Sequence, residues 1–265
     1  MKISPVSVNQ YNTKTQQLKK QNVCNYKTNY NNCCNFSFCG IPVISQKDIP
    51  IKSFDEYKKV LDRIYKYKDS RGCLIFDPTH NFNMYPNIKK EEEGLLLYAG
   101  EVDLSNDINR FLSGRKTKYI GSSMAEDIVR VLDYSLDKLD KNFGTYKGIV
   151  YRQGFFVPNS GQYISTTTEP EIAASIFGGI CISKNLDFYI IQSKTAHKMN
   201  AFQRKMNSDF AEDEEEIIIS RKAKLEEVKN VYGDLLFAKN KFIKILESYA
   251  RRPVDKSRIH VLTEI

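Results

Sequence analysis

The chain has 265 residues and a mass of 30.6 kDa, enough for one large domain or two small ones. Its composition, with 41% hydrophobic and 27% charged residues, is that of an ordinary globular protein. No apolar run approaches the about 18 residues that a membrane-spanning helix needs, so we expect no membrane span. Residues 1–30 lack an apolar core followed by a cleavage site, which argues against a secretory signal peptide.

The net charge of +8 is concentrated at one end of the chain. Residues 1–47 contain six lysines and no acidic residue, so the remainder has 34 basic and 32 acidic residues, a net charge of +2. A body this close to neutral has no electrostatic footprint for a polyanion. The composition therefore argues against a nucleic-acid-binding protein.

Residues 1–46 are predicted to form a disordered polar leader, because they are rich in Asn, Gln, Lys, Ser and Thr and have no apolar period. The leader is compatible with a non-classical export signal, and plain disorder explains it equally well. Its four cysteines fit paired zinc-ligand spacing poorly, so we expect no metal: Cys24, Cys33, Cys34 and Cys39. Cys73 and Cys181 are isolated, which indicates a reducing compartment and no disulfide framework.

Residues 47–265 are predicted to form one domain whose first half is helical. Ser53-Phe-Asp-Glu56 is a capping box, and apolar residues recur at helical spacing from there to about Lys68. A proline- and asparagine-rich loop is expected over residues 77–88, followed by a helix over residues 101–111. A second capping box, Ser123-x-x-Glu126, predicts a long helix that ends before Gly144.

The second half of the domain shows mainly short β signals. Strands are predicted at residues 149–151, 163–168, 186–192, 217–219 and 258–265, with helices at residues 172–177 and 235–250. The polar stretch from Ser193 to Asp213 is too long for a simple turn, so it is a candidate functional loop. Helices first and strands later predict an α+β fold.

Several catalytic signatures are absent from the sequence. It has no glycine-rich dinucleotide motif, no phosphate-binding P-loop and no Gly-x-Ser-x-Gly elbow. The three histidines, His80, His197 and His260, have no metal-ligand spacing, and we interpret each as a surface residue. A histidine-dependent hydrolase or a zinc enzyme is therefore disfavoured.

Three short motifs could carry chemistry. Arg152 ends an apolar strand and could hold a phosphate in a bidentate fork, and Ser165 opens a run of hydroxyl residues. Glu214 and Glu216 are two apart, so an extended backbone would point both carboxylates to one side, next to three isoleucines that could tune them. Taken singly, these motifs read as a surface ion pair, an ordinary strand and a solvated loop.

In this order the motifs resemble the toxin-like mono-ADP-ribosyltransferases of the Arg–Ser–Glu class, which include the bacterial exoenzyme toxins. The matching segments are Gly148-Ile-Val-Tyr-Arg152, Tyr163-Ile-Ser-Thr-Thr167 and Glu214-Glu-Glu216-Ile-Ile-Ile219. The upstream Ile108-Asn-Arg-Phe-Leu112 also resembles that family, and the resemblance spans about Phe54 to Ser220. Where the family usually has Ser-Thr-Ser, this chain has Ser165-Thr166-Thr167, which keeps the hydroxyl.

The resemblance implies N-terminal helices packed on a split, two-sheet β core that cradles NAD. The enzyme would cleave NAD at the nicotinamide–ribose bond and transfer ADP-ribose to a protein side chain, with arginine as the acceptor. Arg152 would bind the diphosphate, Ser165 would orient the catalytic Glu216, and Glu214 would position the incoming guanidinium. The remaining residues implied at the cofactor are Gln153, Gly154, Thr166, Thr167 and Phe177.

The resemblance also implies a protein target, contacted through loop 193–213 with Phe202 or Phe210 as an anchor. We expect a monomer, either a secreted effector that acts in a reducing cytosol or a cytoplasmic protein. Two alternatives remain open. One is an NAD glycohydrolase without a protein target, and the other is a catalytically inactive relative that binds a protein.

Overall fold

The computed structural model describes residues 46–69, 72–76, 85, 87–99, 102–154, 156–175, 186–205 and 215–265. The predicted leader lies outside these residues, as does nearly all of the predicted loop 77–88. The first part of the described chain is helical: η1 Gln46–Asp48, α1 Phe54–Ile64, η2 Lys90–Glu92, α3 Glu93–Ala99, α4 Val102–Leu112 and α5 Ser122–Phe143. None of the helices in the described part of the chain is both long and apolar enough to cross a membrane.

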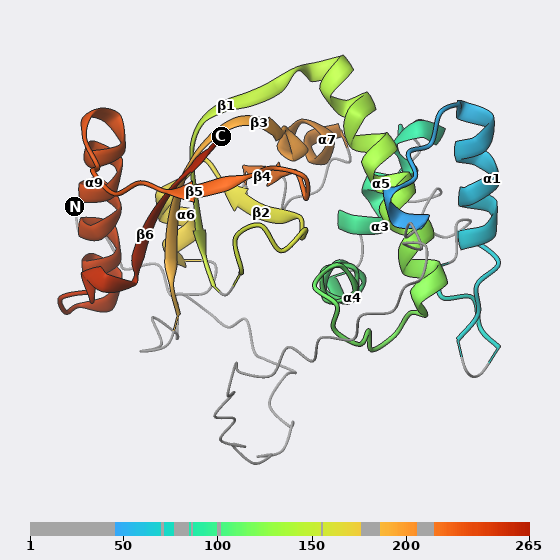
Figure 1. The fold of residues 1–265 in the computed structure, drawn as a ribbon, viewed down its shortest axis with the longest axis horizontal. Coiled ribbons are helices and arrows are strands. Elements are labelled where there is room, and N and C mark those ends of the chain that lie inside the picture. Colours follow the sequence, from blue (N-terminus) through green and yellow to red (C-terminus); the bar gives the residue numbers. More distant parts are fainter. Residues whose placement is uncertain are drawn as a thin grey trace, which may run out of the picture. The chain divides into compact units, whose positions relative to one another are not determined.

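The second part contains the strands, with helices between some of them: β1 Thr145–Gln153, β2 Ile164–Thr167, α6 Pro170–Ser175, β3 Phe188–His197, α7 Met199–Lys205, β4 Glu216–Ile219, β5 Leu225–Glu227, α9 Gly233–Ala250, η3 Lys256–Arg258 and β6 Ile259–Glu264. Figure 1 shows α1, α3, α4 and α5 gathered beside the strands, with α9 lying along β6. The predicted combination of N-terminal helices with a β core is confirmed.

Of the two predicted helix N-termini, the structure confirms the side-chain cap of the first and not that of the second. The Ser53 hydroxyl accepts a hydrogen bond from the Glu56 amide at 3.1 Å, as predicted, and α1 then ends at Ile64, before the predicted Lys68. The second capping box is wrong, because α5 begins at Ser122 with Gly121 as its N-cap and no side-chain cap. The end of α5 is as predicted, since Gly144 has a φ of 70° that favours glycine.

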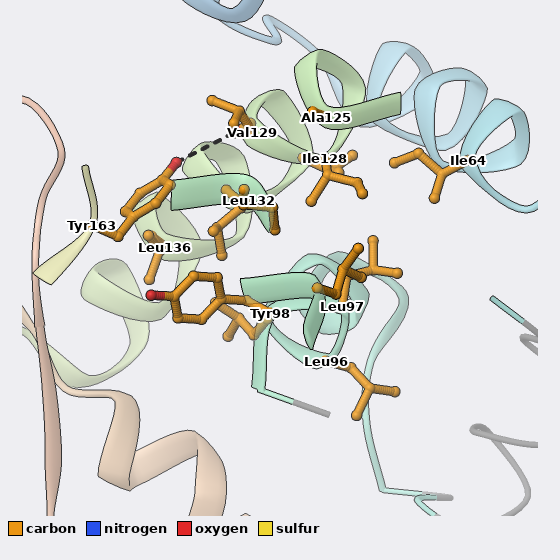
Figure 2. Packing of buried hydrophobic residues seen from close by; sticks show 14 of the residues in the cluster. Ile64, Leu96, Leu97, Tyr98, Ala125, Ile128, Val129, Leu132, Leu136 and Tyr163 are labelled. Carbon is orange, nitrogen blue, oxygen red and sulfur yellow. Dashed lines mark hydrogen bonds between the residues drawn. The ribbon is translucent and has the colours of Figure 1, made fainter. Parts of the chain in front are cut away.

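Helix α3 was not predicted, because its apolar run has no helical period. Six of its residues, from Glu93 to Tyr98, are buried, so almost no polar face marks it as a helix. Gly94 lets α3 approach α5 closely, since a Cβ at this position would lie 2.5 Å from the Ser135 hydroxyl. Figure 2 shows this helical core, with Leu97 of α3 near Ile128 of α5.

The six described strands form one mixed sheet in the order β1-β2-β4-β3-β6-β5, and β1 also pairs with β3. Among the paired strands of the described residues, only β3 and β6 run parallel. Strand β2 meets β1 at the single pair Tyr151↔Thr167, and β4 meets β3 only at His197↔Ile218. The β2–β4 pair is therefore joined to the rest at two points within one sheet, and the predicted division into two sheets is not confirmed.

The predicted loop over residues 193–213 is wrong in its first part. Ser193 to His197 complete β3, and Met199–Lys205 form α7. Phe202 has 0% exposure and belongs to the helical core, so it is not available as an anchor for a target protein. The signal was the helical spacing of Met199 and Phe202 within a mostly polar stretch. Phe210 lies outside the described residues.

Candidate active site

The sheet brings the three predicted motifs to one place. Strand β2 lies between the end of β1 and the start of β4, with Thr167 opposite both Tyr151 and Glu216. Arg152 follows Tyr151 directly, and Ser165 lies two residues before Thr167, on the same face of β2. Residues that are far apart in the sequence therefore share one edge of the fold.

Hydrogen bonds link these residues in a chain. Arg152 Nη1 donates to the carbonyl oxygen of Ser165 at 2.5 Å, and Ser165 Oγ donates to Glu216 Oε1 at 2.5 Å. The Arg152 Nε atom is buried and has no hydrogen-bond partner among the described residues. Burial lowers the pKa of Arg152, yet an arginine stays charged in proteins, so the site retains a cation with an unused donor.

The second carboxylate oxygen of Glu216 is bound by a residue that the sequence did not reveal. Gln203 Nε2, on α7, donates to Glu216 Oε2 at 2.7 Å. Gln203 is only 7% exposed. Its position next to Phe202 could have placed it in a buried helix, but no motif connects it with the acidic run.

Glu215 has different partners from Glu216. Its carboxylate accepts a hydrogen bond from Asn200 Nδ2 at 2.5 Å and pairs with Arg204. Its φ is 41°, in the left-handed region, so the backbone is not extended here. The extended backbone of β4 therefore does not continue through Glu215. Glu214 lies outside the described residues, and its role stays a prediction.

Of the other predicted cofactor residues, two are hydrogen-bonded within the chain and two lie at or just after the end of β1. Thr166 Oγ1 donates to the Ile217 carbonyl oxygen at 2.6 Å, and Thr167 Oγ1 accepts from the Glu169 amide at 3.2 Å. Both hydroxyl groups therefore already make hydrogen bonds to the backbone of this chain. Gln153 is 3% exposed at the end of β1, and Gly154 has a φ of 121° that disfavours other residues. Their cofactor contacts stay predictions, and Phe177 lies outside the described residues.

A pocket of about 270 Å³ lies beside Arg152. It is lined from α4, the following loop, the end of β1 and the β1–β2 connection: Asn106, Asp107, Asn109, Arg110, Arg115, Lys118, Tyr119, Arg152, Phe156, Gln162 and Tyr163. Four of these residues are cationic and one, Asp107, is acidic. Asp107 accepts hydrogen bonds from the amides of residues 118–120, so its charge helps to hold the loop. The pocket is therefore positively charged, with aromatic residues in its lining.

Tyr98 of α3 lies near both charged ends of the hydrogen-bonded chain. Burial raises the pKa of its hydroxyl, and the charge of Glu216 raises it further, so the hydroxyl stays protonated at neutral pH. Its ring packs edge-on against Tyr163 at 5.7 Å between centroids, as Figure 2 shows. This contact connects the helical core to the site.

The histidines and acidic residues in the described part of the chain form no metal site. No group of three or more His, Cys, Asp or Glu side chains there could hold a metal ion. The surface prediction is wrong for His197, which is 6% exposed and lies 2.9 Å from Asp140 through Nδ1. His260 is partly exposed and stacks on Tyr189, and His80 lies outside the described residues.

No protein-family model and no curated protein matches the chain. Solved structures similar to it include Vis toxin, an ADP-ribosyltransferase from Vibrio splendidus, with 16% identity over 83% of this chain and 89% of that one and a TM-score of 0.40. The ADP-ribosyltransferase HopU1 of Pseudomonas syringae pv. tomato DC3000 has 14% identity over 82% of this chain and 100% of that one, with a TM-score of 0.47. The type III effector XopAI from Xanthomonas axonopodis pv. citri has 9% identity over 81% and 84%, with a TM-score of 0.43. Likeness at this level does not decide an activity.

Proposed function

We propose that the chain is a mono-ADP-ribosyltransferase that cleaves NAD at the nicotinamide–ribose bond and transfers ADP-ribose to a protein side chain. The observation that carries this proposal is the hydrogen-bonded chain from Arg152 through Ser165 to Glu216, beside a positively charged pocket. A guanidinium, a hydroxyl and a carboxylate converge where a dinucleotide would need a cation at its diphosphate and an anion at its ribose.

The positive pocket supports the binding of the diphosphate. Arg152 contributes a half-buried cation whose buried Nε is without a partner among the described residues, and Arg110, Arg115 and Lys118 add charge to the lining. Guanidinium groups bind phosphate oxygens in pairs. The aromatic and amide side chains of the lining suit a nucleotide better than a simple anion.

Glu216 is the candidate catalytic residue. Cleavage of a glycosidic bond builds positive charge on the sugar, and a fixed carboxylate stabilises that charge. Ser165 holds Glu216 by a hydrogen bond, so the carboxylate need not reorient during the reaction. Glu214 is proposed to position an acceptor guanidinium, on the resemblance alone.

The proposed setting is a reducing cytosol, with a protein of the target cell as acceptor. Cys73 is a free, exposed thiol, which suits such a compartment. A secreted effector that acts there fits the polar leader predicted from the sequence.

The test is release of nicotinamide from NAD by the full chain, with Glu216→Gln as the control, because glutamine keeps the shape and removes the charge. We expect release by the wild type and a loss of at least about 100-fold in the variant, the scale on which removal of one stabilising group acts. Labelled NAD added to a cell lysate then separates the alternatives. Release without labelled protein would indicate an NAD glycohydrolase, and no release would indicate an inactive binding relative.

A further inference from the structure

Helix α7 is fixed to the start of β4 by several polar contacts. Asn200 and Arg204 bind the carboxylate of Glu215, and Gln203 binds that of Glu216. At its end, Lys205 pairs with the buried Glu92 of η2 at 2.5 Å. The helix therefore supports the two residues that lead into the proposed catalytic strand.

The hydrogen bond to Glu216 determines how the side-chain amide of Gln203 is oriented. A carboxylate only accepts hydrogen bonds, so the amide nitrogen, at 2.7 Å, must be the atom that faces Glu216 Oε2. The amide oxygen of Gln203 is then left buried, without a hydrogen-bond partner among the described residues. A buried acceptor without a partner costs about 1–3 kcal/mol. A methionine or leucine would fill this space without that cost, so packing alone does not explain a glutamine here.

The carboxylate of Glu216 is held at both oxygens from two different elements. Ser165 of β2 donates to Oε1 and Gln203 of α7 donates to Oε2, each in a charge-assisted hydrogen bond. Two donors on opposite oxygens fix the plane of the group as well as its position. They also favour its ionised form, which is the form that can stabilise positive charge.

We propose that Gln203 is a positioning residue for the catalytic carboxylate. It fixes the plane of Glu216 and keeps it ionised at the pH of the reaction. This inference rests on the proposed function, because it assigns Gln203 to the same nicotinamide-cleaving step. It adds a fourth participant, from α7, to the arginine, serine and glutamate of the strands.

Two substitutions affect the proposed role in different ways. Gln203→Met keeps the volume and removes the donor, so kcat for nicotinamide release should fall about 10- to 100-fold, and the acid limb of its pH profile should move to higher pH. The KM for NAD should change little, because the residue does not touch the diphosphate pocket. Gln203→Glu places a second carboxyl against the first. That group can donate only while it is protonated, so activity should persist at acid pH and fall as pH rises.

The experiment measures steady-state nicotinamide release against pH for the wild type and both variants of the full chain. The matched controls are Gln192→Met and Gln192→Glu, at a half-buried glutamine of β3 that pairs with Ile149 and Thr263. They should keep the wild-type pH profile. A urea midpoint for each protein identifies any variant that fails to fold, and if Gln203→Met does so, the isosteric Gln203→Glu decides.

The outcomes are distinguishable. Opposite changes of pH profile in the two Gln203 variants, with wild-type profiles in both Gln192 variants, support the inference. An active wild type whose Gln203 variants keep both kcat and pH profile overturns the positioning role and leaves the proposed function intact. A folded wild type that releases no nicotinamide overturns the proposed function, and the positioning role with it.

Discussion

Replacing Ser165 by alanine separates the two contacts that this residue makes. Its hydroxyl donates to Glu216 Oε1, while its backbone carbonyl accepts from Arg152. Ser165→Ala removes the first contact and keeps the second. A hydrogen bond to a charged group contributes about 1.5–3 kcal/mol, which corresponds to a fall in kcat of about 10- to 150-fold. The KM for NAD should stay near the wild-type value, because the Arg152 contact remains.

The assay is steady-state nicotinamide release over a range of NAD concentrations, with Ser165→Thr as the matched variant that keeps the hydroxyl. We expect Ser165→Thr to recover most of the lost kcat. The Ser165→Ala/Gln203→Met double variant should lose less than the product of the two single effects, because both act through Glu216. Wild-type kcat in Ser165→Ala, or a higher KM with unchanged kcat, would refute this reasoning.

Other substitutions probe binding, transfer and stability. Arg152→Met should weaken NAD binding by about tenfold or more, measured by calorimetry, since about 1.4 kcal/mol of lost phosphate contact already gives that factor; an unchanged Kd would remove Arg152 from the phosphate site. Glu214→Ala should keep nicotinamide release and lose protein labelling, and equal loss of both would show that the acceptor role is misassigned. Phe202→Ala should lower the free energy of unfolding by about 3–5 kcal/mol in urea titrations, as expected for a fully buried ring. Glu264 accepts four hydrogen bonds from β3, and these outweigh its burial and hold its pKa below the ordinary 4.5. Its contribution to stability is complete above that pH and is lost as pH falls through the lower folded value. Glu264→Gln should therefore lose about 2 kcal/mol at pH 7 and progressively less below 4.5, and a difference that does not depend on pH would contradict the role of the charge.

The arrangement of the three motifs could be anticipated because each motif is local and lies on a short strand. Ile217–Ile219 is an unbroken apolar run, so the start of β4 at Glu216 follows from the sequence. Ser165 then takes its face of β2 from simple alternation. What sequence alone could not determine is that β2 touches β1 at a single residue pair, since register between distant strands depends on the whole sheet.

The helices that complete the site were harder to predict. Helix α3 lacks a polar face, whereas α7 lies in a stretch that is mainly polar. Neither sequence therefore shows the regular spacing of apolar residues from which a helix is predicted. Tyr98 and Gln203, which these helices carry, reach the site through tertiary packing and belong to no motif. Residues of this kind can be identified only from the contacts that the Glu216 carboxylate makes in the structure.

The backbone at Glu215 bears on the acceptor prediction in particular. A non-glycine residue at a φ of 41° costs about 1–3 kcal/mol and persists where the surroundings hold it. Here Asn200 and Arg204 hold its carboxylate, so α7 stabilises the backbone conformation of the residue that precedes β4. If transfer depends on the conformation of the chain just before β4, Arg204→Ala, which releases Glu215, should reduce protein labelling more than nicotinamide release. Equal effects on labelling and release would show that Glu215 supports Glu216 alone.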